Sequence, residues 1–433
     1  MKSEKRMLRE CPLAVVLVAV LLTGCNDPAT EQAKVSGGAV PNDAVAVLEK
    51  PVTPQDAEAQ FKLGVAYYKG DGVPKDVGKA IEWWAKAAAQ GHVVAEVYLG
   101  IAYLNGISVP NDVSKALELF EKAAALRNAD AQFNLGEVYR LGLGVPTDRA
   151  KAAEWYEKAA TQGQAHAQVE LSQAYAHGWG VPKNLAKATE WREKAETGGD
   201  RENADVQARL GLAYMVYGEL QNRAKSVYWY EKAAAQGHAG AQTSLGDYYS
   251  MGIGVPKDPA KAIEWWRKAA AQGYVHAQSS MGIAYYNGEG VSKDATKAAE
   301  WWEKAAAQGD VYAQLRMGYA YSEGWGVPKD AAKAVEWYEK AAAQGDVKAQ
   351  FSLGIAYWEG NGVPRDVVRA YAWLNLAAAL TTNASIYPDV AKTNESATEM
   401  RAEIERQMAP AQVAEAQRLS SNWKRGDTLK PSR

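Results

Sequence analysis

One small-residue slot recurs along this chain at a nearly constant interval, and that recurrence limits the folds available to it. The spacing is 36 residues throughout, except for 39 and then 35 around the fifth copy. The slot is occupied by Gly64, Gly100, Gly136, Ser172, Gly211, Gly246, Gly282, Gly318 and Gly354. A fixed period of this length predicts stacked supersecondary units in which each unit contacts only its neighbours.

The first half of each unit predicts a helix, called helix A here. In the first repeat it runs from about Ala57 to Lys69, with Leu63 and Tyr67 at helical spacing. Tyr fills the last slot of this pattern in all nine repeats. We expect Gly64 to let helix A approach the Ala87-Ala88 face of the second helix closely.

The second half predicts another helix, called helix B, after a loop in which Gly70 ends helix A. An N-cap slot precedes helix B and is Asp or Asn in every repeat. Its members are Asp76, Asp112, Asp148, Asn184, Asn222, Asp258, Asp294, Asp330 and Asp366. Two bulky slots follow in helix B, and the first is Trp in eight repeats and Leu119 in the second. Large rings facing small Ala and Gly residues suit an interlocking repeat core.

The combined pattern, LGxxY followed by GxGVPxDxxKAxxWWxKAAxxG, resembles the Sel1-like repeat family. Tetratricopeptide repeats share LGxxY but have a 34-residue period. The resemblance covers residues 57 to about 380 and implies an all-α fold. The expected architecture is a right-handed α/α superhelical solenoid of nine helix-turn-helix repeats. The run MAPAQVAEAQRLSSNW resembles the C-terminal capping helix that closes such arrays.

The N-terminus predicts export. Basic residues precede the apolar run Leu13 to Leu22, which is too short to span a bilayer. Leu22-Thr23-Gly24-Cys25 resembles a bacterial lipobox, which implies that Cys25 is lipidated and becomes the first mature residue; a cleaved signal with a chance Cys is the alternative. Because Asn26 follows Cys25, the resemblance favours the outer membrane, with the array facing the periplasm.

These observations divide the chain into segments. They are a signal peptide (1–24), a flexible tether (25–56), nine repeats (57–380), a loop (381–394), capping helices (395–424) and a tail (425–433). The formal net charge is −2, and removing residues 1–24 leaves 45 basic against 49 acidic residues, a net charge of −4. We therefore expect no nucleic-acid partner.

Catalytic and metal-binding patterns are missing from the sequence. None of the five His residues has a second His or a Cys at ligand spacing, and no nucleophile, phosphate or dinucleotide motif occurs. We expect no enzyme, no cofactor and no metal. Seven i, i+4 pairs predict salt bridges on a solvated face. They are Glu82/Lys86, Glu118/Lys122, Glu154/Lys158, Glu190/Lys194, Glu264/Lys268, Glu300/Lys304 and Glu336/Lys340.

Variable positions beside the packing slots are the candidates for binding a protein partner. In helix-pair solenoids the A helices line the concave face, and Tyr, Trp and Arg dominate binding hot spots. Two tryptophans lie between loop glycines, where a neighbouring loop or another molecule would cover them. The candidates are Lys62, Tyr98, Arg140, Trp179, Arg209, Arg316, Tyr319, Trp325 and Trp358. A ligand-facing surface and drift on a solvated face both explain the variation.

The fifth repeat departs from the others. Arg201-Glu202-Asn203 is inserted before it, and its loop lacks the GVP turn. We expect a change of pitch here that divides the array into four repeats and five.

Three functions compete. The resemblance favours an envelope adaptor that binds a protein and catalyses nothing. The second is an immunity lipoprotein that neutralises a secreted toxin such as a lipase. The third is a β-lactamase-like enzyme, which the lack of paired cysteines in the repeats disfavours.

Overall fold

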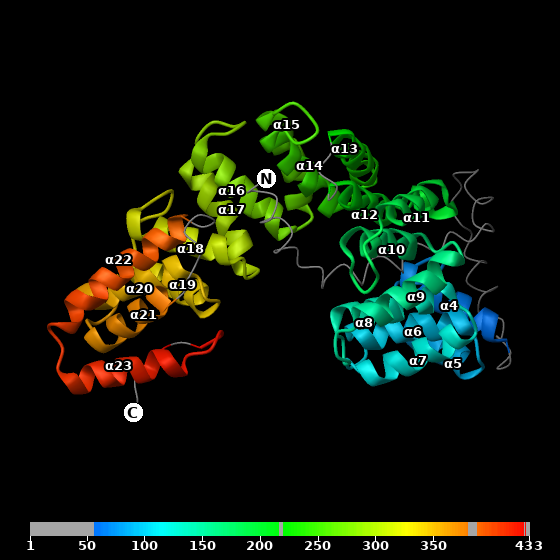
Figure 1. Cartoon of the computed structure of the whole chain (residues 1–433), viewed down its shortest axis with the longest axis horizontal. Coiled ribbons are helices and arrows are strands. Elements are labelled where there is room, and N and C mark those ends of the chain that lie inside the picture. The colour runs from blue at the N-terminus through cyan, green and yellow to red at the C-terminus, as the bar shows by residue number, and fades with distance from the viewer. Residues whose placement is uncertain (1–55, 216–219, 380–387, 428, 430–433) are drawn as a thin grey trace. The chain divides into compact units, whose positions relative to one another are not determined.

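A computed structural model describes residues 56–215, 220–379, 388–427 and 429 of the chain. Within these residues the regular structure is entirely helical, as predicted (Figure 1). The predicted signal peptide, Cys25 and nearly all of the tether lie outside them. None of the helices described here is long and apolar enough to cross a membrane.

Each repeat contributes an A helix and a B helix. The A helices are α4 (Ala57–Lys69), α6 (Val93–Asn105), α8 (Ala129–Leu141), α10 (Ala165–His177), α12 (Ala204–Met215), α14 (Ala239–Met251), α16 (Val275–Asn287), α18 (Val311–Glu323) and α20 (Val347–Glu359). The B helices are α5 (Val77–Ala89), α7 (Val113–Ala125), α9 (Arg149–Thr161), α11 (Leu185–Thr197), α13 (Leu220–Ala235), α15 (Pro259–Ala271), α17 (Ala295–Ala307), α19 (Ala331–Ala343) and α21 (Val367–Ala379). Within a unit, each B helix packs against its own A helix and generally against the next one along the chain.

The chain forms two compact units. The N-terminal unit ends at Gln236 after five repeats, and the C-terminal unit begins at Gly237 with the sixth. This boundary lies one repeat after the predicted change of pitch, which stays a prediction. The inserted residues before the fifth repeat lie in and just after a short 3-10 helix, η2 (Gly199–Glu202).

Helix ends follow the predicted capping chemistry in eight repeats. The Asp76 carboxylate accepts a hydrogen bond from the Lys79 backbone N–H at 3.0 Å, and the corresponding residues act in the same way up to Asp366. Asn222 is the exception, because α13 begins earlier, at Leu220. His92 and His238 have an equivalent role at helix A, where each Nδ1 accepts from a backbone N–H.

The recurrent glycine of helix A makes room for a ring of helix B. A Cβ built on Gly64 would lie 2.5 Å from the Trp84 indole, so the partner is the second bulky slot and not Ala87-Ala88 as expected. The same contact recurs from Gly100 with Phe120 to Gly318 with Tyr338. The slot tolerates a hydroxymethyl group in the fourth repeat, where Ser172 corresponds to Gly64 and the flexible Arg192 replaces the ring.

The invariant tyrosine of helix A is covered by a cation from helix B. Lys79 Nζ lies 5.2 Å from the Tyr67 ring centroid, and the equivalent pair is present in every repeat, ending with Arg369 over Tyr357. Cation–π attraction at a partly exposed site contributes about 0.5–1 kcal/mol. The pair explains why this slot selects Tyr rather than an aliphatic residue.

The predicted Glu/Lys salt bridges are mostly wrong. Of the seven pairs, only Glu190 and Lys194 are in ion-pair contact, at 2.7 Å. Six of the seven lysines lie over the tryptophan three residues earlier, as Lys340 does at 3.7 Å above Trp337, while Lys122 pairs with Glu96. The other members are Lys86 over Trp83, Lys158 over Trp155, Lys194 over Trp191, Lys268 over Trp265 and Lys304 over Trp301. A ring is a broad acceptor close to the lysine stem, whereas the carboxylate is well hydrated.

Buried amides join successive repeats. The Gln314 amide donates to the Ala306 carbonyl of the preceding repeat at 3.2 Å and accepts from Gln344 of its own repeat at 2.8 Å. Gln132, Gln168, Gln278 and Gln350 donate to preceding repeats in the same way. Each buried amide thereby satisfies a carbonyl on the neighbouring repeat.

The second repeat lacks this amide pair. Glu96, which is fully buried, replaces the helix A glutamine and pairs with Lys122. The helix B glutamine is replaced by Leu126, which is 62% exposed. Arg127 follows at φ 61°, where the other repeats mostly have glycine.

Two helices cover the last repeat. They are α22 (Pro388–Glu405) and α23 (Pro410–Asn422), which bury Ile404 and Ala416 against α21. Asn375 donates to Ser420 Oγ at 2.8 Å across this contact. Because α22 begins at Pro388, residues 388–394 of the predicted loop are helical instead.

We predict that Gly282→Ala destabilises the array by about 1–3 kcal/mol, because the new Cβ would lie 2.3 Å from the Trp302 ring. Thermal unfolding followed by circular dichroism measures this. Gly78→Ala is the control, since Gly78 is helical and its added Cβ would meet only Asp76 at 3.4 Å. Equal melting temperatures for the two variants would contradict the ring contact.

Candidate functional site

The predicted binding residues of the N-terminal unit mostly serve the fold. Tyr98 is buried at 7% exposure, with its ring 5.0 Å from Trp84, so it packs within the fold. Trp179 stacks on His177 at 4.3 Å, beneath the guanidinium of Arg149. The neighbouring segments therefore cover much of this loop tryptophan, although 37% of it stays exposed.

Lys62 is the most exposed of the predicted residues in this unit. Its ammonium lies 3.2 Å from Glu58 on the same helix, and two-thirds of the side chain faces solvent. Such a pair is worth little to stability, so Lys62 is available to a partner.

Arg140 and Arg209 belong to a partly buried ionic cluster on α8, α10 and α12. Arg140 forms a bidentate pair with Glu137 at 2.8 and 2.6 Å, and Glu137 also accepts from the Tyr156 hydroxyl. Arg209 pairs with Glu170 and, at 2.9 Å, with Asp205. The charges of both arginines are therefore neutralised within the chain.

Electrostatics in this cluster follow from burial and pairing. Burial raises the pKa of Glu137, but the hydrogen bonds and charge of Arg140 outweigh it, so the pKa is lowered overall. Asp130 has no such cation, and burial raises its pKa above the ordinary value despite a hydrogen bond from Gln164. The cluster is a set of compensated charges with a structural role.

The C-terminal unit has the opposite arrangement at corresponding positions. Arg316 lies on α18 among rings, its guanidinium carbon 4.8 Å from the Tyr312 centroid and 5.9 Å from that of Tyr286. Its Nε is buried without a hydrogen-bond partner, and no carboxylate of the described residues is within ion-pair distance. Arg316 is therefore the uncompensated arginine of the A helices.

Aromatic residues extend this surface. Trp325, from the loop after α18, lies 5.2 Å from Tyr286 of the preceding repeat and 6.2 Å from Tyr319. Burial raises the pKa of Tyr319 above its ordinary value. We call Tyr286, Tyr312, Arg316, Tyr319 and Trp325 the aromatic–arginine cluster.

Trp358 lies on α20, in the repeat after this cluster. Arg365 covers its ring at 4.6 Å and donates to its backbone carbonyl at 2.9 Å. Trp358 keeps a partly exposed edge, but a loop cation has already taken one of its faces.

The partners of these arginines were not among the predicted site residues. Asp205 was missing, although its i, i+4 spacing to Arg209 is readable in the sequence. Tyr286 and Tyr312 were also missing, because their importance depends on how α16 and α18 pack. Repeat register alone could have paired Glu170 with Arg209, since both lie two residues after the helix A glutamine.

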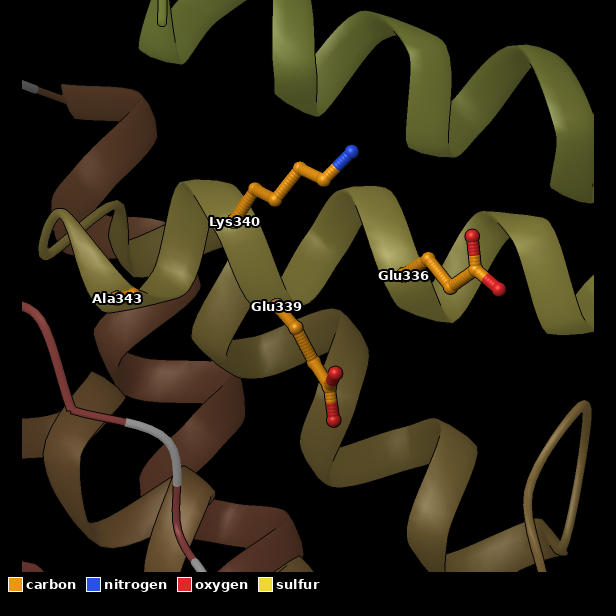
Figure 2. A pocket seen from close by; sticks show the side chains of 4 residues that line it. All are labelled: Glu336, Glu339, Lys340 and Ala343. Carbon is orange, nitrogen blue, oxygen red and sulfur yellow. The ribbon is translucent and has the colours of Figure 1, made fainter.

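A shallow hollow on α19 has no chemistry of its own. Glu336, Glu339, Lys340 and Ala343 line it, and Figure 2 shows its charged side chains pointing in different directions. Glu339 accepts from the Tyr357 hydroxyl at 3.3 Å, while Lys340 lies over Trp337. Its two carboxylates therefore do not converge as an acid and base pair would. In the described part of the chain, no group of three or more His, Cys, Asp or Glu side chains could hold a metal ion.

We predict that Arg209→Met and Arg316→Met, at the same slot of helix A, differ widely in stability. Arg209→Met leaves Glu170 and Asp205 buried without their cation, so it lowers the free energy of unfolding by about 3–5 kcal/mol. The second removes no ion pair and costs about 1 kcal/mol or less. Chemical unfolding of both variants measures the difference in unfolding free energy. Similar losses would contradict the claim that Arg209 is paired with carboxylates whereas Arg316 is not.

Comparison with known proteins agrees with this architecture. A Sel1 repeat protein from Oxalobacter formigenes is 31% identical, with a TM-score of 0.51, over 81% of this chain and 99% of that one. A protective antigen of uropathogenic Escherichia coli with an SLR fold is 32% identical, with a TM-score of 0.39, over 88% and 94% of the two chains. An immunity protein from Pseudomonas aeruginosa is 21% identical, with a TM-score of 0.29, over 60% and 85%, which is too distant to bear on function. Among curated proteins, none matches the chain significantly.

The Sel1 repeat model matches nine consecutive segments of the chain. They are residues 57–92, 93–128, 129–164, 165–200, 204–238, 239–274, 275–310, 311–346 and 347–381. These segments coincide with the helix pairs described above, including the fifth pair with its inserted residues before it. The chain therefore belongs to the Sel1 repeat family.

Proposed function

We propose that this protein is a non-enzymatic adaptor that binds a protein partner through the A helices of its C-terminal unit. Proteins built from Sel1 repeats generally mediate protein–protein interactions and are typically scaffolds without catalytic activity. The aromatic–arginine cluster carries the proposal, because it places uncompensated Arg316 beside partly exposed tyrosines and Trp325.

The contrast between the two units supports this choice of surface. In the third to fifth repeats, arginines on the A helices are neutralised by Glu137, Glu170 and Asp205. In the eighth repeat the rings of Tyr286 and Tyr312 surround the arginine instead. Arginine and aromatic side chains are enriched in the energetically dominant parts of protein interfaces. The C-terminal unit thus presents an arginine without a carboxylate partner, whereas the arginines on the A helices of the N-terminal unit are already paired within the chain.

We also propose that Cys25 anchors the protein to the bacterial envelope, with the outer membrane and the periplasmic face favoured. The support is the resemblance of Leu22-Thr23-Gly24-Cys25 to a lipobox. Two or more acyl chains provide the stable attachment that one chain does not. An adaptor held in this way would recruit its partner at the membrane surface.

We predict that a photoreactive phenylalanine analogue at Ser322, beside the cluster, crosslinks to one specific partner in living cells. Immunoblotting and mass spectrometry identify the adduct. The matched control is the same analogue at Arg267, an exposed residue of helix B in the same unit. No adduct from Ser322, or the same adduct from both positions, would contradict an adaptor acting through its A helices.

The anchor has a separate test. We predict that Cys25→Ala abolishes metabolic labelling with an alkynyl fatty acid and moves the protein from the membrane fraction to the soluble fraction. Cys11→Ala is the control, because Cys11 precedes the expected cleavage site and should leave both labelling and fractionation unchanged. Persistent labelling of Cys25→Ala would show that another residue carries the lipid.

A further inference from the structure

In the fifth repeat, the arginine two residues after the helix A glutamine binds carboxylates of its own chain. Arg209 lies two residues after the buried Gln207, and its guanidinium contacts two carboxylates. Glu170 comes from the same slot one repeat earlier, whereas Asp205 lies one helical turn before Arg209. All three side chains are at most 12% exposed, so the charges compensate one another away from water.

Arg316 occupies the same slot in the eighth repeat, two residues after Gln314, without those carboxylates. Ser280 takes the place of Glu170, and Tyr312 takes the place of Asp205. No ion pair joins Arg316 to any described residue, and its Nε is buried and unpartnered. Of the three guanidinium nitrogens only Nε is buried and unpartnered, so the two Nη groups are the donors that a carboxylate from outside the chain can reach.

The surrounding rings fix this guanidinium. Its carbon lies 5.8 Å from the Trp302 centroid, and Trp302 itself is only 1% exposed and forms the floor of the cluster. Tyr286 and Tyr312 flank it. Rings attract a guanidinium through their faces and leave its in-plane N–H groups free to donate, so the fork is preorganised for a planar acceptor.

We propose that Arg316 binds the carboxylate of an Asp or Glu side chain of a polypeptide partner, with an adjacent apolar residue packing on Trp325 and Tyr319. This proposal rests on the adaptor function above and names the chemistry recognised. Charge complementarity selects the acid, because a carboxylate matches the guanidinium fork with two parallel hydrogen bonds. The partly exposed rings beside it favour a peptide over a small free anion.

Two substitutions test the site from opposite directions. Arg316→Gln removes the charge, and Arg267→Gln is its control on an exposed face of helix B. Ser280→Glu supplies the missing carboxylate from within the chain, at the slot of Glu170. Ser244→Glu is the matched control, because it has the same slot in the sixth repeat and no arginine follows it at Ser280.

The probe is a random dodecapeptide library displayed on phage and selected against the immobilised full-length chain. The enriched peptide is then synthesised with a fluorophore, both as selected and with its acidic residue changed to the amide. We expect enriched peptides to share an acidic residue beside an aromatic or aliphatic one. Fluorescence anisotropy should show binding weakened about tenfold to a hundredfold by the amide change, by Arg316→Gln and by Ser280→Glu.

Arg316→Gln should bind the acidic and amide peptides equally, while both controls retain wild-type affinity. The proposal is overturned if Arg316→Gln binds the acidic peptide as tightly as wild type, or if selection enriches no acidic peptide. It is also overturned if free glutamate displaces the peptide as well as the unlabelled peptide does, which indicates a small-anion site. Circular dichroism verifies that each variant is folded. If Ser280→Glu does not fold, the result with Arg316→Gln tests the proposal by itself. These outcomes leave the crosslinking result from Ser322 standing, so the adaptor function fails only by its own test.

Discussion

The contact between a side-chain-free Cα on helix A and a ring on helix B sets the distance between the two layers of the array. Gly64 against Trp84 and Gly282 against Trp302 bring backbone and ring closer than any Cβ allows. The distance between the helix A and helix B layers also affects the next repeat, because within a unit each B helix is generally the surface on which the next A helix packs. The exception in the fourth repeat follows the same rule, because Arg192 can bend away from Ser172 whereas a ring cannot.

Polar side chains then determine how repeats join. The buried amide of Gln314 reaches a carbonyl of the preceding repeat, while the cation over each invariant tyrosine joins the two helices within a repeat. Hydrogen bonds need defined geometry, whereas apolar packing tolerates sliding. The amides therefore fix the register in which one repeat sits on another.

Much of this fold can be predicted from the sequence because its signals are local and repeated. The period, the N-cap at Asp76 and the helix pair are all readable from residues a few positions apart. The lysine partners were mispredicted because a carboxylate four residues before the lysine and a ring three residues before it are both within reach on the same helix face. Competition between them depends on hydration, which sequence spacing does not report.

The candidate site was harder to predict for a related reason. Arg209 and Arg316 occupy the same position of helix A in their repeats, so the sequence alone does not distinguish them. Their difference lies in residues from the preceding repeat and one turn earlier, where Glu170 and Asp205 give way to Ser280 and Tyr312. The neighbours of a charged residue in space thus decide whether it stabilises the fold or binds a partner. In a repeat protein, residues with different neighbours can occupy the same position of the repeat, so the sequence period does not distinguish them.

The second repeat has a consequence for how the array comes apart. Because Glu96 cannot donate to the preceding repeat, no amide joins the second repeat to the first in the way that Gln132 joins the third to the second. In a one-dimensional stack, cooperativity is only as long as its unbroken run of nearest-neighbour couplings. The first repeat would therefore separate from the second more readily than the second separates from the third, where Gln132 supplies the coupling.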